Sequence, residues 1–217
     1  MTGIAENLQA MRARLRAAGV TLLAVSKGQS AERIREAAAA GQNAFGENYV
    51  QEALAKMRSA PDLEWHLIGP LQSNKTRNVA EHFAWVQTVE REKVAQRLSE
   101  QRPEAMAPLN VLIQVNVSGE ATKSGVAPDD VASLAQAISG MKRLRLRGLM
   151  AIPEPHAPRD RYREVRWIYE ALKPRFGFDT LSMGMSDDME VAIAEGATMV
   201  RIGTAIFGPR ARTRSAA

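Results

Sequence analysis

The sequence of 217 residues contains no cysteine, few histidines and no long apolar run. The absence of cysteine excludes disulfide bonds, thiolate catalysis and cysteine-ligated metals. The three histidines, His66, His82 and His156, are too widely spaced to form a metal-ligand motif. No segment approaches the roughly 20 apolar residues of a membrane span, and the N-terminus lacks the apolar core of a secretory signal. We therefore expect a cytoplasmic protein that binds neither metal nor membrane.

Charge of neither sign dominates strongly, although 29 lysines and arginines against 24 aspartates and glutamates leave a net charge of +5. A positive excess raises the possibility of a nucleic-acid partner. The basic residues are spread along the chain, however, apart from residues 141–147 and 209–215. The first of these segments alternates like a strand and the second has the character of a frayed terminus, so we expect no nucleic-acid partner.

Short apolar runs alternate with helical patterns along the chain. After an amphipathic N-terminal helix come eight candidate strands, at residues 21–26, 43–46, 65–69, 85–89, 109–117, 146–152, 179–184 and 198–203. The helix-like segments between them are 31–41, 47–60, 74–83, 91–101, 128–140, 159–173 and 186–196. Strands separated by helices pair in parallel, because parallel neighbours need a crossover connection.

Eight such units in one short chain predict a closed (β/α)₈ TIM barrel. A doubly wound open sheet is the alternative, but the glycine-rich dinucleotide motif is absent after the first strand. No linker rich in Pro, Gly or Ser divides the chain. We therefore expect one domain over residues 1–217, with an extra helix within 1–19 and a frayed tail at 209–217.

Enzymes with this fold carry their chemistry at the C-terminal ends of the strands. Lys27 follows the first strand in the segment "LLAVSKGQS". A lysine partly removed from water loses preference for its charged form, and its free amine can attack an aldehyde to form a Schiff base. The alternative is a lysine that merely caps a strand end into water.

The segments "SMGMS" and "RIGTAIFG" follow the last two strands, where barrels frequently bind phosphate. The backbone N–H groups of Gly203 and Thr204, which are expected to open a helical turn, can donate to phosphate oxygens, as can the hydroxyl groups of Ser186 and Thr204. The alternative is two tight turns whose methionines fill the core. Asp187 and Asp188 would repel a phosphate dianion, so this prediction requires both carboxylates to point away.

Arg201 lies on the last strand among apolar neighbours and is expected to point into the barrel. A buried arginine needs a partner, because an unpaired buried charge is costly. A pyridine nitrogen could accept its N–H. A carboxylate lining the barrel, such as that of Glu47, could pair with it instead, and the sequence alone leaves both open.

Several long strings resemble one known family, the pyridoxal-phosphate homeostasis proteins, also called proline synthetase co-transcribed homologues. The strings are "AVSK", "FGENYVQEA", "WHLIGPLQSNK", "QVNVSGEATKSGV", "LRGLMAIP" and "LSMGMSDDMEVAIAEGATMVRIGTAIFG". The resemblance runs from about Leu22 to Gly208. It departs from the family at residues 28–30, where "GQS" stands and relatives often have threonine, lysine and proline.

The resemblance implies a single barrel like the N-terminal domain of alanine racemase, with pyridoxal 5′-phosphate held as an internal aldimine. By motif position, Lys27 is the Schiff-base lysine, Arg201 faces the pyridine nitrogen and Asn48 lies beside the ring. The residues that the resemblance assigns to the phosphate are Ser186, Gly203 and Thr204.

The implied function is a carrier or buffer of the cofactor in vitamin B6 homeostasis, without robust catalysis of its own. Its expected partners are pyridoxal phosphate and apo forms of enzymes that use it, and we expect a monomer. The alternative is an amino-acid racemase or another enzyme dependent on pyridoxal phosphate. Alanine racemase draws its second base from a tyrosine of another domain. Here Tyr162 and Tyr169 are expected to face outward, and only Tyr49, beside Asn48, lies near the expected site.

Two further residues have open roles. Lys123, in the loop "GEATKSG", could act as a second amine or be a solvated loop lysine. His66 lies in an apolar strand and is expected to be a hydrogen-bonded core histidine rather than an acid or base.

Overall fold

The computed structural model describes residues 3–119 and 124–209. The strands within these residues are β1 (Thr21–Val25), β2 (Ala44–Glu47), β3 (Glu64–Leu67), β4 (Trp85–Val89), β5 (Leu109–Val115), β6 (Leu144–Ala151), β7 (Thr180–Ser182) and β8 (Met199–Ile202). The α-helices are α1 (Ile4–Arg16), α2 (Ala31–Ala39), α3 (Val50–Met57), α4 (Thr76–His82), α5 (Glu92–Gln101), α6 (Val131–Ser139), α7 (Arg159–Phe176), α8 (Met189–Ala194) and α9 (Thr204–Phe207). Two short 3₁₀ turns are η1 (Ser73–Lys75) and η2 (Pro128–Asp130).

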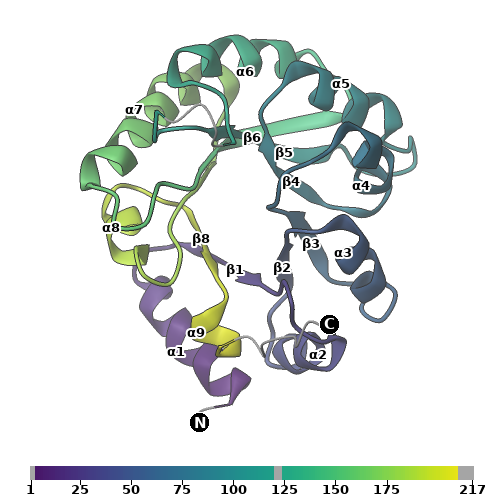
Figure 1. Cartoon of the computed structure of the whole chain (residues 1–217), viewed down its shortest axis with the longest axis vertical. Coiled ribbons are helices and arrows are strands. Elements are labelled where there is room, and N and C mark those ends of the chain that lie inside the picture. The colour runs from purple at the N-terminus through teal and green to yellow at the C-terminus, as the bar shows by residue number, and fades with distance from the viewer. Residues whose placement is uncertain (1–2, 120–123, 210–217) are drawn as a thin grey trace, which may run out of the picture.

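The eight strands form a closed parallel barrel in sequence order (Figure 1). Closure comes from the pairing of β8 with β1, where Thr21 lies opposite Met199 and Ala24 opposite Ile202. Helices surround the strands on the outside (Figure 1). The expected (β/α)₈ barrel is therefore confirmed, and the open sheet is excluded.

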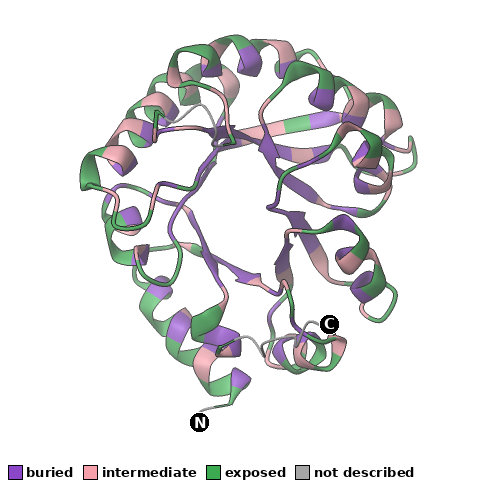
Figure 2. Ribbon diagram, viewed as in Figure 1, coloured by how far each residue is buried: buried purple, intermediate pink, exposed green. Residues whose placement is uncertain are grey.

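Apolar side chains fill both faces of the barrel wall. Inside, Leu23, Ile68 and Met199 pack together near one part of the wall, and a second cluster joins Trp85, Leu112 and Met150. Outside, buried apolar strand residues such as Phe45, Leu67 and Val86 pack with the inner faces of the helices in one continuous cluster. Figure 2 shows this layering, with buried strands and helices that are buried only on the side facing them. Burial on both faces explains why the strands read as nearly continuous apolar runs.

The N-terminal helix α1 is an addition to the eight strand–helix units. Its buried side chains are Ile4, Leu8, Met11 and Leu15. It packs against α2 and α9, and Arg12 donates from Nη1 to the carbonyl oxygen of Ala40 at 2.7 Å. Of the tail expected at 209–217, residues 210–217 lie outside the described residues.

Several element boundaries differ from the expected ones by a few residues. Strand β6 begins at Leu144, two residues before the expected start, so residues 144–147 of the alternating basic segment belong to it. The helical turn expected at Gly203 and Thr204 is present as the short helix α9, which brings Thr204 to the rim.

No described helix combines the length and the apolar character needed to traverse a lipid bilayer. Within residues 3–119 and 124–209, no cluster of three or more His, Cys, Asp or Glu side chains could hold a metal ion.

Candidate functional site

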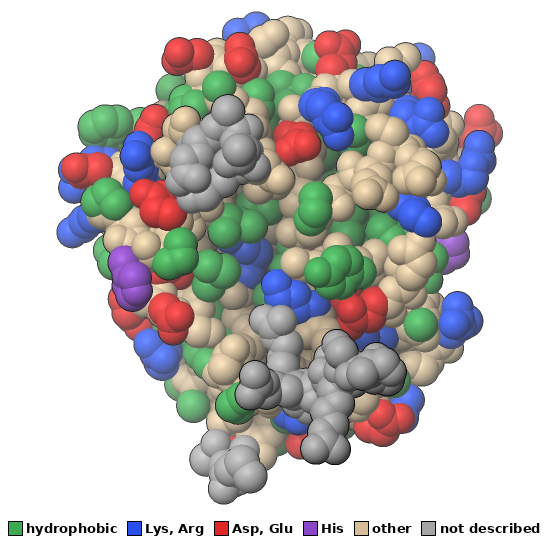
Figure 3. Space-filling model, viewed as in Figure 1, with side chains coloured by type: hydrophobic (Ala, Val, Ile, Leu, Met, Phe, Trp, Pro, Cys, Tyr) green, Lys and Arg blue, Asp and Glu red, His purple; other side chains and the backbone are tan. Residues whose placement is uncertain are grey.

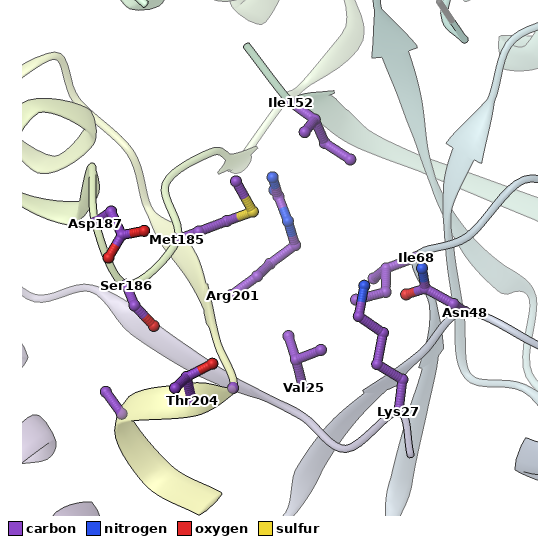
Figure 4. Close-up of a pocket in the computed structure, with 12 residues that line it drawn as sticks. Val25, Lys27, Asn48, Ile68, Ile152, Met185, Ser186, Asp187, Arg201 and Thr204 are labelled. Atoms are coloured by element: carbon purple, nitrogen blue, oxygen red, sulfur yellow. The ribbon is translucent and has the colours of Figure 1, made fainter. Parts of the chain in front are cut away.

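A cavity of about 590 Å³ opens at the C-terminal ends of the strands. Its walls come from the ends of β1, β2, β3, β6, β7 and β8 (Figure 4). All six residues predicted to bind a cofactor line it: Lys27, Asn48, Ser186, Arg201, Gly203 and Thr204. Figure 3 shows basic side chains at the centre of a hollow bordered by hydrophobic side chains. The size is typical of a site for a small molecule or cofactor.

Lys27 sits in a tight turn after β1. The backbone N–H of Ser26 donates to the carbonyl oxygen of Gly46 at 3.0 Å, which extends the β1–β2 pairing by one residue. Gly28 then adopts a left-handed conformation with φ of 72°, which costs glycine little. The side chain of Lys27 points into the cavity, between Arg201 and Asn48 (Figure 4).

A buried ion cluster lies behind this turn, between the barrel and α3. The Lys56 ammonium donates to the Ser26 carbonyl oxygen at 2.7 Å, to Glu47 Oε1 at 2.7 Å and to Glu52 Oε1 at 2.6 Å. Glu52 also accepts from the backbone N–H of Gly28 at 2.6 Å. Both chain neighbours of Lys27 are thus held by charged partners, which fixes the position of its backbone.

Glu47 faces this cluster and not the barrel interior. It is fully buried and accepts from the hydroxyl of Ser26 at 2.5 Å as well as from Lys56. Burial raises the pKa of the Glu47 carboxyl, although its bonds to Lys56 and Ser26 oppose that shift. The alternative that Glu47 pairs with Arg201 is therefore wrong, because alternation along β2 places Gly46, not Glu47, on the inner face.

Arg201 points from β8 across the barrel mouth and is almost fully buried. Its Nη1 donates to the carbonyl oxygen and the hydroxyl of Ser182, both at 2.8 Å, and its Nη2 donates to the carbonyl oxygen of Ala151 at 2.8 Å. Burial lowers the pKa of Arg201 to about 10, so the guanidinium remains charged near neutral pH. One Nη2 hydrogen and the Nε hydrogen make no hydrogen bond to the described residues, which leaves two donors for a ligand.

The wall opposite Lys27 carries the predicted anion donors. Ser186 follows β7 and Thr204 follows β8, and both lie along one side of the cavity (Figure 4). Gly203, the chain neighbour of Thr204, also lines the cavity. A Cβ atom at Gly203 would lie 3.2 Å from the Val25 carbonyl oxygen, so the absence of a side chain lets β1 and β8 approach closely.

The two aspartates beside this wall differ. Asp188 points away as expected, because its carboxylate accepts from the Tyr162 hydroxyl at 2.6 Å and from the backbone N–H of Met185. Asp187 instead lines the cavity, which contradicts the expectation that both would turn away. The site therefore combines two basic residues with one acidic residue.

The prediction for two tyrosines is also wrong. Tyr162 and Tyr169 face the core of the protein, each only 2% exposed, because their spacing along α7 places them on the same face as Val165. Burial and the nearby Asp188 raise the pKa of Tyr162. Tyr49 is 64% exposed and is not among the cavity-lining residues.

His66 is a core histidine, as predicted. It is fully buried and lies 2.9 Å from both Glu64 and Gln87 through its two ring nitrogens. Lys123 lies outside the described residues.

Apolar residues of the cavity were missed by the sequence analysis. They are Val25, Ile68, Ile152, Met185 and Ala205. Strand periodicity could have found two of them. Val25 lies two residues before Lys27 and Ile68 two residues after His66, so each points to the same face of its strand as that residue.

The closed parallel barrel and the lysine-bearing cavity at its rim define the class of protein. Residues 1–211 match the family model "Alanine racemase, N-terminal domain". An alanine racemase from Corynebacterium glutamicum superimposes with a TM-score of 0.75 over 97% of this chain and 62% of its own, at 18% identity, which reflects the shared fold.

Much closer similarity is found to smaller proteins. A pyridoxal phosphate homeostasis protein of Pseudomonas aeruginosa is 58% identical, and one of Escherichia coli is 52% identical, over 97% of this chain and 97% and 98% of theirs. The structure of PipY from Synechococcus elongatus with pyridoxal phosphate bound has a TM-score of 0.84 at 39% identity, covering 94% of this chain and all of that one. The chain therefore belongs to the family of pyridoxal phosphate homeostasis proteins.

Proposed function

We propose that this chain binds pyridoxal 5′-phosphate as a Schiff base on Lys27 and carries or buffers the cofactor in vitamin B6 homeostasis, without robust catalysis. The observation that carries the proposal is the convergence of Lys27, Arg201 and a wall of phosphate donors on one cavity. The bound pyridoxal phosphate in PipY, which this chain matches over 94% of its length, supports the identity of the ligand.

The residues present fit each part of this cofactor. Lys27 supplies an amine for the aldehyde, and Arg201 has N–H groups available for the pyridine nitrogen. Val25, Ile68 and Met185 offer apolar surface for the ring. We assign the phosphate to Ser186, Gly203 and Thr204 and the side of the ring to Asn48. The Arg201 guanidinium in the cavity offsets the charge of Asp187.

The covalent step requires the free amine of Lys27. Its Nζ attacks the aldehyde carbon, a C–N bond forms, and loss of one water leaves the C=N bond. The step is reversible, because water can add back and release the aldehyde. Reversible capture in an open, single-barrel site suits a carrier that delivers a reactive aldehyde to apo-enzymes.

A weak electron sink follows from the partner assigned to the ring nitrogen. When bound, pyridoxal phosphate acts as an electron sink, and a protonated ring nitrogen strengthens that sink. Arg201 donates a hydrogen bond and cannot accept a proton from the ring, so it favours the unprotonated nitrogen. None of the described tyrosines lines the cavity to act as a second base.

The spectrum of the purified protein tests the proposal. Wild-type protein incubated with pyridoxal phosphate and then desalted is expected to keep a yellow absorption band. Lys27→Ala should lose the band, whereas Lys142→Ala, which removes an exposed lysine before β6, should keep it. Retention of an unchanged band by Lys27→Ala contradicts the proposed aldimine.

A further inference from the structure

A line of buried polar side chains crosses the barrel interior beneath Arg201. The guanidinium donates to the Ser182 hydroxyl at 2.8 Å, and that hydroxyl donates to Gln87 Oε1 at 2.7 Å. Gln87 Nε2 lies 2.9 Å from His66 Nδ1, and His66 Nε2 lies 2.9 Å from Glu64 Oε1. Ser182, Gln87 and His66 are all fully buried. An unbroken chain of four hydrogen bonds therefore joins the cavity arginine to a carboxylate.

The carboxylate lies at the opposite mouth of the barrel. Glu64 is the first residue of β3, whereas the cavity opens beyond the other ends of the strands. Its side chain is 40% exposed, so the series of hydrogen bonds runs from a buried cation, Arg201, to a partly solvated anion, Glu64. Few of the inward-facing positions of a barrel are normally polar, since apolar side chains fill its interior layers.

The two ends fix the direction of every hydrogen bond. Arginine can only donate, and an ionised carboxylate can only accept. The Ser182 hydroxyl therefore accepts from Arg201 and donates to Gln87, while Gln87 donates its amide hydrogen to His66. His66 then accepts at Nδ1 and carries its proton on Nε2, and burial lowers the pKa of His66 and keeps the ring neutral.

The dipoles of these three hydrogen-bonded side chains consequently point the same way. The hydroxyl oxygen of Ser182, the amide oxygen of Gln87 and the Nδ1 lone pair of His66 each face toward Arg201. Hydrogen bonds aligned in this way polarise one another in a medium of low dielectric constant. Among the described residues Arg201 has no carboxylate within salt-bridge distance, so these dipoles stabilise a buried cation that lacks a direct ion pair.

We propose that Gln87 and His66 are positioning residues that act through Ser182 to hold Arg201 in the orientation that meets the ligand, and that they couple the ligand site to Glu64 at the opposite mouth. The proposal rests on the proposed function, because its ligand is pyridoxal phosphate. Coupling between two sites is reciprocal: if His66 affects binding of the ligand at Arg201, then binding of the ligand affects His66. Binding at the cavity should therefore be detectable at His66.

Nitrogen-15 NMR of histidine-labelled protein tests this coupling. The chain contains three histidines, and exposed His82, at the end of α4, serves as an internal control. Unliganded wild-type protein is expected to show a neutral His66 protonated at Nε2. Addition of pyridoxal phosphate should shift the His66 ring signals and leave those of His82 unchanged. Binding without any shift at His66 overturns the proposal, whereas absence of binding to wild-type protein overturns the proposed function instead.

Two replacements of Gln87 separate positioning from packing. Gln87→Met keeps the volume but removes both hydrogen bonds, so it should raise the Kd for pyridoxal phosphate at least about fivefold and abolish the response of His66. Gln87→Glu keeps an oxygen that accepts from the Ser182 hydroxyl, and protonation of His66 places a cation beside the new carboxylate. This variant should therefore lose less affinity for pyridoxal phosphate than Gln87→Met. A purely structural role for Gln87 predicts the reverse order, because methionine packs well and a buried carboxylate does not.

Ser182→Ala gives a second break in the chain with a small change in volume. It should likewise uncouple His66 from the ligand while the carbonyl oxygen of Ser182 still accepts from Arg201. A His66 signal that still responds to pyridoxal phosphate in this variant contradicts the proposal, even where Gln87→Met fails to fold.

Discussion

At the scale of single residues, the position of Lys27 depends on a second lysine. Lys56 lies behind the turn and donates to the Ser26 carbonyl oxygen, while its partner Glu52 accepts from the N–H of Gly28. Lys56 is 7% exposed and Glu47 is fully buried, so their bond is not weakened by water. The ion cluster therefore anchors the turn from the side remote from the cavity.

Lys56→Met is expected to destabilise the protein by about 3–5 kcal/mol, because it leaves the buried Glu47 carboxylate without its cation. Urea unfolding measures the loss. Lys93→Met, at an exposed position on α5, is the matched control and should unfold at nearly the wild-type denaturant concentration.

The double variant Lys56→Met/Glu47→Met distinguishes anchoring from stability. Replacement of a buried ion pair by apolar residues is often nearly neutral, so much of the stability should return. Retention of pyridoxal phosphate should be impaired in both the single and the double variant, because the Ser26 carbonyl oxygen lacks its donor in each. Full recovery of both properties would show that Lys56 does not position the Lys27 turn.

Sequence periodicity explains which residue-scale predictions succeeded. Lys27 and Arg201 could be placed at the cavity because Lys27 follows a recognisable strand and Arg201 lies near the end of another. The Lys56–Glu47 pair joins positions on a helix and a strand, and only the three-dimensional packing of α3 on β2 brings them together. Tyr162 was misplaced because the many charges on α7 concealed an apolar face of the helix.

At the scale of elements, α7 and α8 are joined through one carboxylate. Glu195, just after α8, is almost fully buried and accepts a hydrogen bond from Arg159. Arg163 and Arg166, which lie on α7 with Arg159, are within 4.0 Å of the Glu195 carboxylate oxygens. The hydrogen bond from Arg159 holds the pKa of Glu195 below its usual value. This contact fixes the segment that carries Ser186 and Asp188 against the long helix.

The lowered pKa makes the contribution of Glu195 dependent on pH. The unfolded chain binds a proton at this position more readily than the folded one, so the stabilisation is present above the unfolded pKa and is lost as pH falls through the folded pKa. Glu195→Gln should therefore melt below wild type near neutral pH, and the difference in Tm should shrink on acidification to about pH 3. Thermal unfolding at several pH values measures it, and a constant difference contradicts the assignment.

The existence of the strands was more predictable than the bounds of the elements. The eight strands follow from apolar runs that are buried on both faces. Helix α9 has four residues, too few for a helical period, so only its opening turn at Gly203 and Thr204 was expected. The expected start of β6 lay two residues after Leu144, because its first residues alternate with arginines.

At the scale of the whole molecule, one barrel supplies every group assigned to the cofactor. The titratable residues that line the cavity, among those described, are Lys27, Asp187 and Arg201. Alanine racemase shares the barrel over only 62% of its chain, whereas the homeostasis proteins are matched over nearly their entire length. The site therefore combines cofactor capture with few groups suited to moving a substrate proton.

We expect little or no exchange of amino-acid α-hydrogens. Protein loaded with pyridoxal phosphate, incubated with each common amino acid in deuterated water, should incorporate no more deuterium than free pyridoxal phosphate at the same concentration. Mass spectrometry measures the exchange. Rapid exchange by wild-type protein that disappears in Lys27→Ala would instead identify a racemase or a related enzyme.

The most direct measurement is borohydride reduction of the cofactor-loaded protein followed by peptide mapping. Reduction converts the C=N bond into a stable amine, so the cofactor remains on the residue that held it. A single phosphopyridoxyl adduct on Lys27 is expected. An adduct on another lysine, or no adduct on protein that retains the colour, would contradict it.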